Sequence, residues 1–406
     1  IGNCGLLVPP QQGTSFCIEY SVRDGDQFLD KSLEYEVEEF WSSNQKYVYT
    51  LSFDGEALLL ELKPRYIKIM SSVPNIITIS NLDYDAPDFG VSLEYSYDAR
   101  EWHTMPWYEK KSGTFGSQSS SGSTGRMGWG CMDIDLNYMI QFGYLTGNEA
   151  YLIPFDSEIY LRGNNPGGLA YMKDDYNGSV TQINFRYSGD TTSPLMTPNC
   201  EIQIEGDLKY LVNCETDITE INQPLCFAML FGNDRLVRTW SETPERIQYR
   251  NITRVPDLDV DLATGPRCMY MTYAGLNLSE APLLSATYVG ERSYEGCFEL
   301  CSTMTESPEL PATAIGNYGY MHLFYGCSAL NKITSYTYDL GTCGDYWYSQ
   351  TPNSFEWVSG VADSGSFIIT GPTVPTSNHI ASHRGDNYIP EGWTVEHRSS
   401  GQSWSP

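Results

Sequence analysis

Apolar and polar positions recur at a fixed step in the segment 266–341. Three series of apolar positions show this step: Cys268, Tyr294 and Tyr320; Met271, Cys297 and Leu323; Leu278, Met304 and Leu330. A fixed period of roughly 20–50 residues is typical of stacked repeats, in which each unit buries its apolar face only against its neighbours. The pattern therefore predicts a short solenoid with a continuous interior.

Within one unit, the spacing predicts a short helix followed by an extended turn. Tyr294, Phe298 and Cys301 lie at helical spacing (i, i+4, i+7), so they would share one apolar stripe. Ser307-Pro308 and Leu310-Pro311 then end the helix, because proline fixes φ and disfavours helix at the residue before it.

Segments around the repeats predict an insertion and two caps. A weaker unit ends at Leu236, which precedes the equivalent Leu278 by more than one repeat step, so we expect an inserted loop near Ser241–Asp257. Asn199–Asn213 reads as a hairpin at the start of the stack, and Trp357–Val395 follows its end. Both are expected to act as caps, because the terminal units of a solenoid must cover its open ends.

Alternating apolar and polar residues predict strands in the N-terminal half. Gln45–Phe53 and Glu56–Leu62 flank Asp54-Gly55, a strong hairpin signal, whereas Asp30–Phe40 fits either a short helix or a strand. Further short strands separated by turns predict a sandwich: Asn75–Ser80, Val91–Tyr97, Ala150–Pro154 and Glu158–Arg162. The Ser- and Gly-rich segment Lys111–Gly130 is typical of a flexible loop, with a contact loop at a sheet end as the alternative.

Two strings in the repeats, Glu309-Leu-Pro-Ala-Thr313 and Leu323-Phe-Tyr-Gly-Cys-Ser-Ala-Leu330, resemble BspA-like leucine-rich repeats. The resemblance covers about residues 200–335. Such repeats are common in surface and virion proteins of gut Bacteroidota and their phages. Trp357–Phe367 with Ile389–Val395 resembles the module that often closes these proteins, and Leu93–Asp98 with Ile159–Asn164 resembles the small β-sandwich that precedes the repeats.

Pattern and resemblance together predict a mainly β fold with short helices. We expect four parts: an N-terminal anchoring β region at 1–65, a β-sandwich-like domain at 66–195, BspA-like leucine-rich repeats forming a short solenoid at 196–335, and a C-terminal cap at 336–406.

Charge narrows the classes of partner. The chain carries 51 acidic against 24 basic residues, a formal net charge of −27. Nucleic acid is therefore not expected as a partner, because its binding requires a basic surface that displaces counterions. No apolar run reaches the roughly 18 residues of a membrane span, so none is expected. This composition is typical of extracellular or virion-exposed proteins.

Most of the 11 cysteines are expected to act as small buried residues of the repeat, because Cys297, Cys301 and Cys327 fall on periodic positions. Two pairs, Cys4–Cys17 and Cys200–Cys214, would form local disulfides in an oxidising compartment.

The sequence holds no GxSxG elbow, no Walker loop and no dinucleotide fingerprint, and its many acidic residues nominate no glycosidase pair, so we expect no enzyme, no catalytic residue and no cofactor. His379 and His383 are four residues apart, but Ser377, Asn378 and Gly385 around them favour a loop over a metal-binding helix. The aspartates of Asp257–Leu262 alternate and predict one solvated strand face. Calcium binding by such acidic segments is the alternative.

Aromatic side chains are the better interaction signal, since they bury much area at low entropic cost. Two groups stand out as candidates to stack on sugars or anchor a partner, with core or cap residues as the alternative: Trp102, Trp107 and Tyr108; Tyr346, Trp347 and Tyr348.

The expected function is that of a non-enzymatic structural and adhesion protein on a virion surface, such as a phage head or tail fibre or decoration protein. The alternative is a bacterial cell-surface adhesin or extracellular filament subunit. The expected partners are other copies or other proteins in a homo-oligomer, virion or filament, and a glycan or protein of the host surface.

Overall fold

The computed structural model describes residues 15–24, 27–36, 49–53, 58–62, 64–83, 91–104, 126–129, 132–135, 150–172, 178–187, 201–232, 251–341 and 353–405. Within these ranges the chain is mainly β with two short helices, which confirms the predicted class. Contacts divide it into two units, Ile1–Arg65 and Tyr66–Pro406. No helix in the described ranges is long and apolar enough to cross a membrane.

The first unit contains two antiparallel hairpins. β1 (Ser15–Asp24) pairs with β2 (Gln27–Glu36), and β3 (Tyr49–Phe53) pairs with β4 (Leu58–Leu62). The predicted pairing of the two segments around Asp54-Gly55 is confirmed, although that turn lies outside the described residues. The sequence left helix or strand open for Asp30–Phe40. The described part of this segment belongs to β2 and is therefore a strand.

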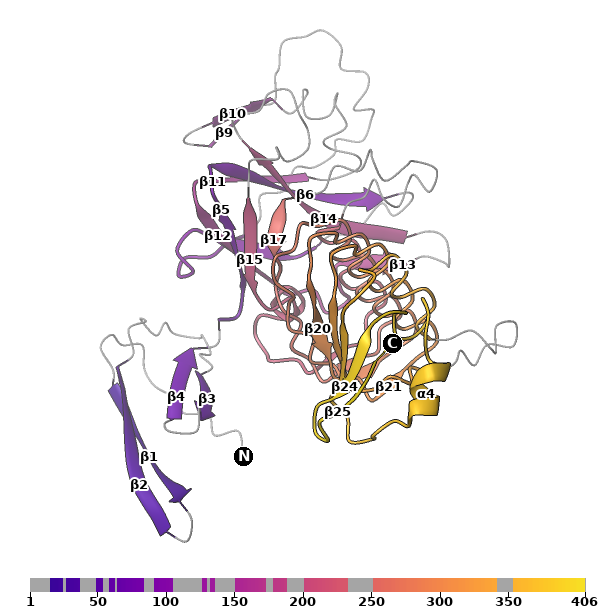
Figure 1. Ribbon diagram of the computed structural model, residues 1–406. Helices are drawn as coiled ribbons and strands as arrows, with labels where there is room; N and C mark the ends of the chain where they lie inside the picture. Colours follow the sequence, from indigo (N-terminus) through magenta and orange to yellow (C-terminus); the bar gives the residue numbers. More distant parts are fainter. Residues whose placement is uncertain are drawn as a thin grey trace. The chain divides into compact units, whose positions relative to one another are not determined.

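The second unit begins with two sheets (Figure 1). One has six strands in the order β17 (Ile252–Arg254), β15 (Ile202–Gly206), β5 (Ile67–Ser71), β12 (Glu158–Gly163), β7 (Leu93–Ser96) and β8 (His103–Thr104). The other has four, in the order β11 (Ala150–Phe155), β6 (Asn75–Asp83), β14 (Gly178–Tyr187) and β13 (Ala170–Met172). Alternate residues of both sheets, such as Ile69, Ile159 and Ile183, are fully buried in one common core.

A separate hairpin pairs β9 (Arg126–Trp129) with β10 (Met132–Asp135). The flexible loop predicted for Lys111–Gly130 is therefore wrong over Arg126–Trp129, where the backbone pairs in register with the next strand. Residues 111–125 and 130 of that prediction lie outside the described ranges.

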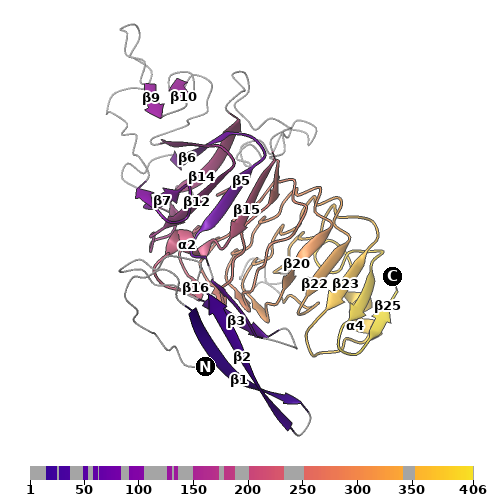
Figure 2. The same cartoon turned by 90° about the vertical axis from the view of Figure 1, so that its left-hand side faces the viewer.

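Short parallel strands follow in two further sheets. One holds β16 (Glu220–Ile221), β18 (Leu262–Ala263), β19 (Tyr288–Val289) and β21 (Ala314–Ile315). The other holds β20 (Glu306–Leu310), β22 (Lys332–Ser335), β23 (Ser366–Ile369), β24 (Thr394–His397) and the antiparallel edge strand β25 (Gln402–Trp404). Figure 2 shows β5 and β15 followed in one row by β20, β22, β23 and β25. Many rungs join positions that are one repeat step apart, as in the pair of Tyr288 with Ala314.

Between the strands the backbone forms runs of consecutive turns at 224–229, 266–275, 291–300, 317–326 and 353–360, so the helix predicted around Phe298 is wrong. In the run 291–300, Cys297 N–H donates to the Tyr294 carbonyl three residues back (3.2 Å), whereas Tyr294 N–H donates to Gly319 of the next run (3.0 Å). Every second N–H thus reaches a neighbouring unit. An α-helix would use all of these donors internally, so it would leave none for stacking.

The turn geometry requires positive φ at regular positions. Arg292, Gly296 and Leu300 have φ of 51°, 61° and 59°, each at the third residue of a turn. This is the backbone of a type II turn, which costs a non-glycine residue about 1 kcal/mol or more. The hydrogen bonds and packing between units offset this conformational cost.

Two columns of buried aromatic rings fill the interior. Neighbouring centroids in the first column are 6.4, 5.5, 5.8 and 5.9 Å apart and belong to Phe231, Tyr273, Phe298, Phe324 and Trp357. The second column joins Tyr294, Tyr320 and Trp357 at 6.1 and 5.9 Å. Aromatic pairs of this kind, some stacked and some tilted, add about 0.5–1.5 kcal/mol each beyond the burial of their area.

The buried cysteines bridge the units through hydrogen bonds. Cys301 Sγ donates to the Tyr273 carbonyl at 3.1 Å, and Cys327 Sγ donates to the Phe298 carbonyl at 3.0 Å. Both are free thiols, and burial raises the pKa of Cys301 to about 12. The prediction that the periodic cysteines are small core residues is confirmed. Cys4 and Cys200 lie outside the described residues, so the two predicted disulfides stay predictions.

Other segments satisfy the backbone groups at both ends of the turn runs. At the first run, the sheet that contains β14 supplies a donor: Ile183 N–H donates at 2.8 Å to the carbonyl of Leu230, which directly follows the run. At the other end, Glu356 N–H donates to Asn387 Oδ1 at 2.6 Å, and Trp357 Nε1 donates to the Tyr388 carbonyl at 2.7 Å. Each end therefore has partners for donors or acceptors that would otherwise be buried and unmet.

Two local predictions in the flanking segments are wrong. Lys209–Val212, predicted as the second strand of a hairpin, forms the short helix α2 with all four residues buried. Ser377–Ser382, predicted as a loop, forms α4, because the Thr376 hydroxyl accepts a hydrogen bond from His379 N–H and caps the first turn.

Candidate functional site

Of the six predicted interaction residues, the structure describes Trp102 alone; Trp107, Tyr108, Tyr346, Trp347 and Tyr348 lie outside the described residues. Trp102 immediately precedes β8 at the edge of the six-stranded sheet, and its side chain is half-buried. The residues around Trp102 are therefore the part of the predicted interaction surface whose contacts the structure describes.

The outward face of β12 places a charged row beside this tryptophan. Arg162 lies opposite Glu94 in the register of β12 with β7, and Glu94 lies opposite Thr104 of β8. On the other side, Tyr66 directly precedes Ile67, the β5 residue that pairs with Leu161. Because side chains alternate across a strand, Arg162 points away from the buried Leu161 and toward this outward face.

Arg162 is held from two directions. Its Nε is 2.7 Å from Glu94 Oε2, and its guanidinium carbon is 4.1 Å from the centroid of the Trp102 ring. The Tyr66 ring lies 5.9 Å from the same indole. The arginine side chain keeps 23 % of its surface exposed. A carboxylate and an aromatic face together restrict the guanidinium to one orientation.

A second polar group adjoins this one on the same face. Lys68 Nζ is 2.7 Å from Glu158 Oε2, and the Tyr160 hydroxyl donates to Glu158 Oε1 at 2.8 Å. The hydrogen bond from Lys68 lowers the pKa of Glu158, whereas burial raises the pKa of Tyr160. The Tyr66 and Tyr160 rings meet edge to face at 5.1 Å, which joins the two groups.

We name the following seven residues the sheet-face cluster: Tyr66, Lys68, Glu94, Trp102, Glu158, Tyr160 and Arg162. It combines aromatic surface with fixed donors and acceptors, which is the chemistry of recognition. Sequence reasoning found Trp102 and missed the others. The alternation in Glu158–Arg162 already set Glu158, Tyr160 and Arg162 on one face, so that signal was present.

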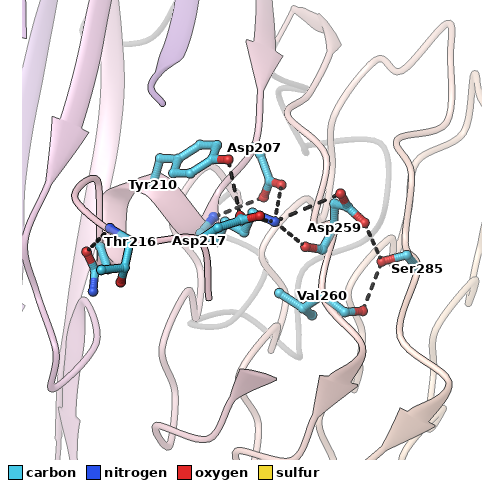
Figure 3. A network of polar contacts seen from close by, with 9 residues as sticks. Asp207, Tyr210, Thr216, Asp217, Asp259, Val260 and Ser285 are labelled. Atoms are coloured by element: carbon cyan, nitrogen blue, oxygen red, sulfur yellow. Dashed lines mark hydrogen bonds and ion pairs between the residues drawn. The ribbon is translucent and has the colours of Figure 1, made fainter. Parts of the chain in front are cut away.

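A buried lysine forms a second charged network where the sheets meet the repeats (Figure 3). The Lys209 side chain is 3 % exposed, and its Nζ lies 2.8 Å from Asp217 Oδ1 and 3.5 Å from Asp207 Oδ2. It also donates to the Asp259 carbonyl at 2.7 Å. Burial raises the pKa of Asp207 to about 6, against the opposing charge of Lys209. This network ties α2 to the neighbouring extended segment, which is a structural role.

The acidic segment Asp257–Leu262 takes part in stacking. Its alternation is confirmed, because Leu258 and Val260 are buried between the aspartates. Asp257 Oδ1 accepts from Leu283 N–H at 2.7 Å, and Asp259 Oδ1 accepts from Ser285 Oγ at 3.0 Å. The predicted solvated face thus also bonds the next unit, one repeat step further along the chain.

The two predicted histidines lie in α4 and directly after it, and both rings have hydrogen-bond partners within the chain. His383 Nδ1 lies 2.8 Å from the His379 carbonyl, and His379 Nδ1 lies 3.3 Å from the Tyr338 hydroxyl. Across the residues that the structure describes, no group of three or more His, Cys, Asp and Glu side chains is placed to hold a metal ion.

Comparison of the chain with protein-family models, with curated proteins and with solved structures gave no match.

Proposed function

We propose that this chain is a non-enzymatic, surface-exposed structural and adhesion protein. In this proposal residues 196–335 form a short solenoid of BspA-like leucine-rich repeats, the preceding sheets form a sandwich-like domain, and residues 336–406 form the cap. The observation that supports it most is that the packing follows the repeat step of the sequence: Phe298 stacks on Phe324, and Tyr294 stacks on Tyr320.

The stacked interior favours a binding role through the surfaces that it leaves outside. The buried aromatic columns fill the inside of the stack, so its strands and turns present their outward side chains to partners. Short bonds between units, such as Lys332 Nζ with Glu306 Oε2 at 2.8 Å, hold these outward side chains in rows. Rows of outward side chains on a stack offer an extended surface for attachment.

We further propose that the chain is a phage virion component, such as a head or tail fibre or decoration protein that contacts the host surface. The net charge of −27 suits a particle that stays dispersed, and the resemblance of the repeats points to gut Bacteroidota and their phages. The second candidate is a bacterial cell-surface adhesin or extracellular filament subunit, which the same repeats favour equally.

One experiment tests adhesion and separates the two candidates. Fluorescently labelled chain is incubated with intact gut Bacteroidota cells and with unrelated bacteria, and retained label is measured after washing. Antibody raised against the chain is then used for immunogold imaging of phage particles and of uninfected cells. Retention on Bacteroidota cells is expected, with gold on particles for a virion component and on cells for an adhesin. Absence of retention on every strain would contradict adhesion.

The non-enzymatic part of the proposal has its own test. Purified chain is incubated with a panel of polysaccharides, and reducing ends are measured over time. We expect binding without an increase in reducing ends. Turnover of any polysaccharide that persists through repurification would contradict this part.

A further inference from the structure

The guanidinium of Arg162 has N–H donors that no acceptor in the described residues takes up. Glu94 takes the Nε–H through one oxygen, and the Trp102 ring lies against the plane. Within the described ranges, the N–H groups on Nη1 and Nη2 have no protein acceptor, and 23 % of the side chain is exposed. An arginine fixed at Nε offers its terminal edge as a planar fork, and that fork matches a carboxylate.

We infer that the sheet-face cluster binds a sugar that carries a carboxylate, with Arg162 holding the carboxylate and Trp102 packing on the sugar ring. This inference rests on the proposed adhesion function and names the class of ligand for one of its surfaces.

The neighbouring residues explain why a sugar, and not a bare anion, fits this place. Arg162 covers one face of the Trp102 ring and Tyr66 lies beside it, but Trp102 is only half-buried, so part of its apolar surface lies next to the open donors. Aromatic rings pack well against the C–H faces of sugars, and the adjacent polar groups fix orientation. Lys68 lies opposite Tyr160, two residues along β12 from Arg162 on the same face, and pairs with Glu158; the pair supplies a donor and acceptors for hydroxyl groups.

Local charge selects a singly charged group. Lys68 and Arg162 are balanced by Glu158 and Glu94, so the cluster is neutral within a strongly acidic chain. A phosphate monoester carries nearly two charges, so it would meet stronger repulsion from the two nearby carboxylates and from the acidic field of the chain. A carboxylate carries one charge in a planar group, and it gains two charge-assisted hydrogen bonds from the fork.

Calorimetry and saturation-transfer NMR on the full chain test the inference with two matched probes. Methyl glucuronide carries the carboxylate, and methyl glucoside has the same ring without it. We expect glucuronide binding at least about tenfold tighter than glucoside binding. Arg162→Lys keeps the charge but loses the planar fork, and roughly tenfold weaker binding is expected. Trp102→Ala is expected to weaken both the binding and the transfer to the sugar ring protons.

Arg398→Gln is the matched control, because Arg398 is an exposed arginine that also pairs with a glutamate, Glu309 at 3.4 Å. It is expected to leave glucuronide binding unchanged. Thermal unfolding establishes that each variant folds, and Trp102→Phe, which keeps a flat ring, is expected to retain most of the binding. Equal binding of the two probes, unchanged binding by Arg162→Lys, or competition by acetate as strong as by glucuronide would overturn the inference. If cells still retain the chain in that case, adhesion stands without this site.

Discussion

Phe298 and Phe324 lie one repeat step apart in the chain, and their rings stack with centroids 5.8 Å apart and planes 22° from parallel. Both are fully buried, and each donates its N–H to the next turn run, Phe298 to Leu323 and Phe324 to Trp357. The two residues thus occupy equivalent settings that a shift of one unit relates. A core built in this way depends on every ring in the column.

Replacement of Phe324 by alanine tests this dependence. The ring packs between Phe298 and Trp357, so its loss leaves a cavity in the middle of the column. We expect the free energy of unfolding to fall by about 3–5 kcal/mol, as measured by urea denaturation. Tyr288→Ala is the control, because Tyr288 is 38 % exposed, and a loss below about 1 kcal/mol is expected. Similar losses for both variants would argue against a shared column.

Five buried cysteines in the described part of the repeats predict a clear reactivity pattern. Cys226, Cys268, Cys297, Cys301 and Cys327 are fully buried free thiols, and burial raises the pKa of Cys268 to about 12. Thiols that are neutral and inaccessible do not react with a disulfide reagent. We expect no labelling of these five by Ellman's reagent in the native chain and complete labelling in denaturant, with peptide mapping to identify each site. Rapid native labelling of Cys301 would contradict the packing.

Among the charged residues of the Lys209 network, Lys209 itself is expected to contribute most to stability. Its replacement by methionine leaves the buried Asp207 without its counter-charge, and such a loss costs about 3–5 kcal/mol. Asp217→Asn is the matched comparison, because the Asp217 side chain is 43 % exposed, and a loss within about 1 kcal/mol is expected. Chemical denaturation measures both. A stable Lys209→Met variant would show that the network contributes little.

Glu299 predicts how stability depends on pH. Burial raises the pKa of Glu299 to about 7, and the nearby charge of Glu295 adds to the shift. The folded pKa lies above the unfolded value of about 4.3, so the contribution of this group is full below pH 4 and is lost as pH rises to 7. Asp207, with a pKa of about 6, acts in the same direction. We expect Glu299→Gln to remove part of the fall in unfolding free energy between pH 5 and pH 8. An unchanged pH profile would contradict the shift.

The sequence predicted the period of the repeats well, because every unit must place similar apolar residues at the same step to fill one core. It predicted the backbone of the units poorly. Tyr294, Phe298 and Cys301 fit a helix by spacing, yet the stack needs every second N–H for the next unit, so turns form instead. The spacing of apolar residues within one unit carries no information about the hydrogen bonds between units.

The candidate site shows a similar limit. Aromatic content identified Trp102, but the partners of Trp102 come from Tyr66 and Arg162, which are far apart in sequence and meet through sheet order. Strand alternation gives the face on which a residue lies and leaves open which strands are neighbours. Buried Lys209 was missed for the same reason, since Asp259 reaches it from another segment.

The central claim is that successive units stack, so that residues one repeat step apart lie side by side. Engineered cross-linking tests this arrangement most directly. Thr287 and Thr313 are exposed, one repeat step apart, and joined by a backbone hydrogen bond of 2.8 Å, next to the parallel pair of β19 and β21. Adjacent rungs lie about 4.8 Å apart, which suits a disulfide. The double variant Thr287→Cys, Thr313→Cys should form that bond under mild oxidation, as seen by peptide mass. The variant Thr287→Cys, Asp339→Cys, two units apart, should not. Failure of the first bond, or equal yield of the second, would contradict the stacked-unit account.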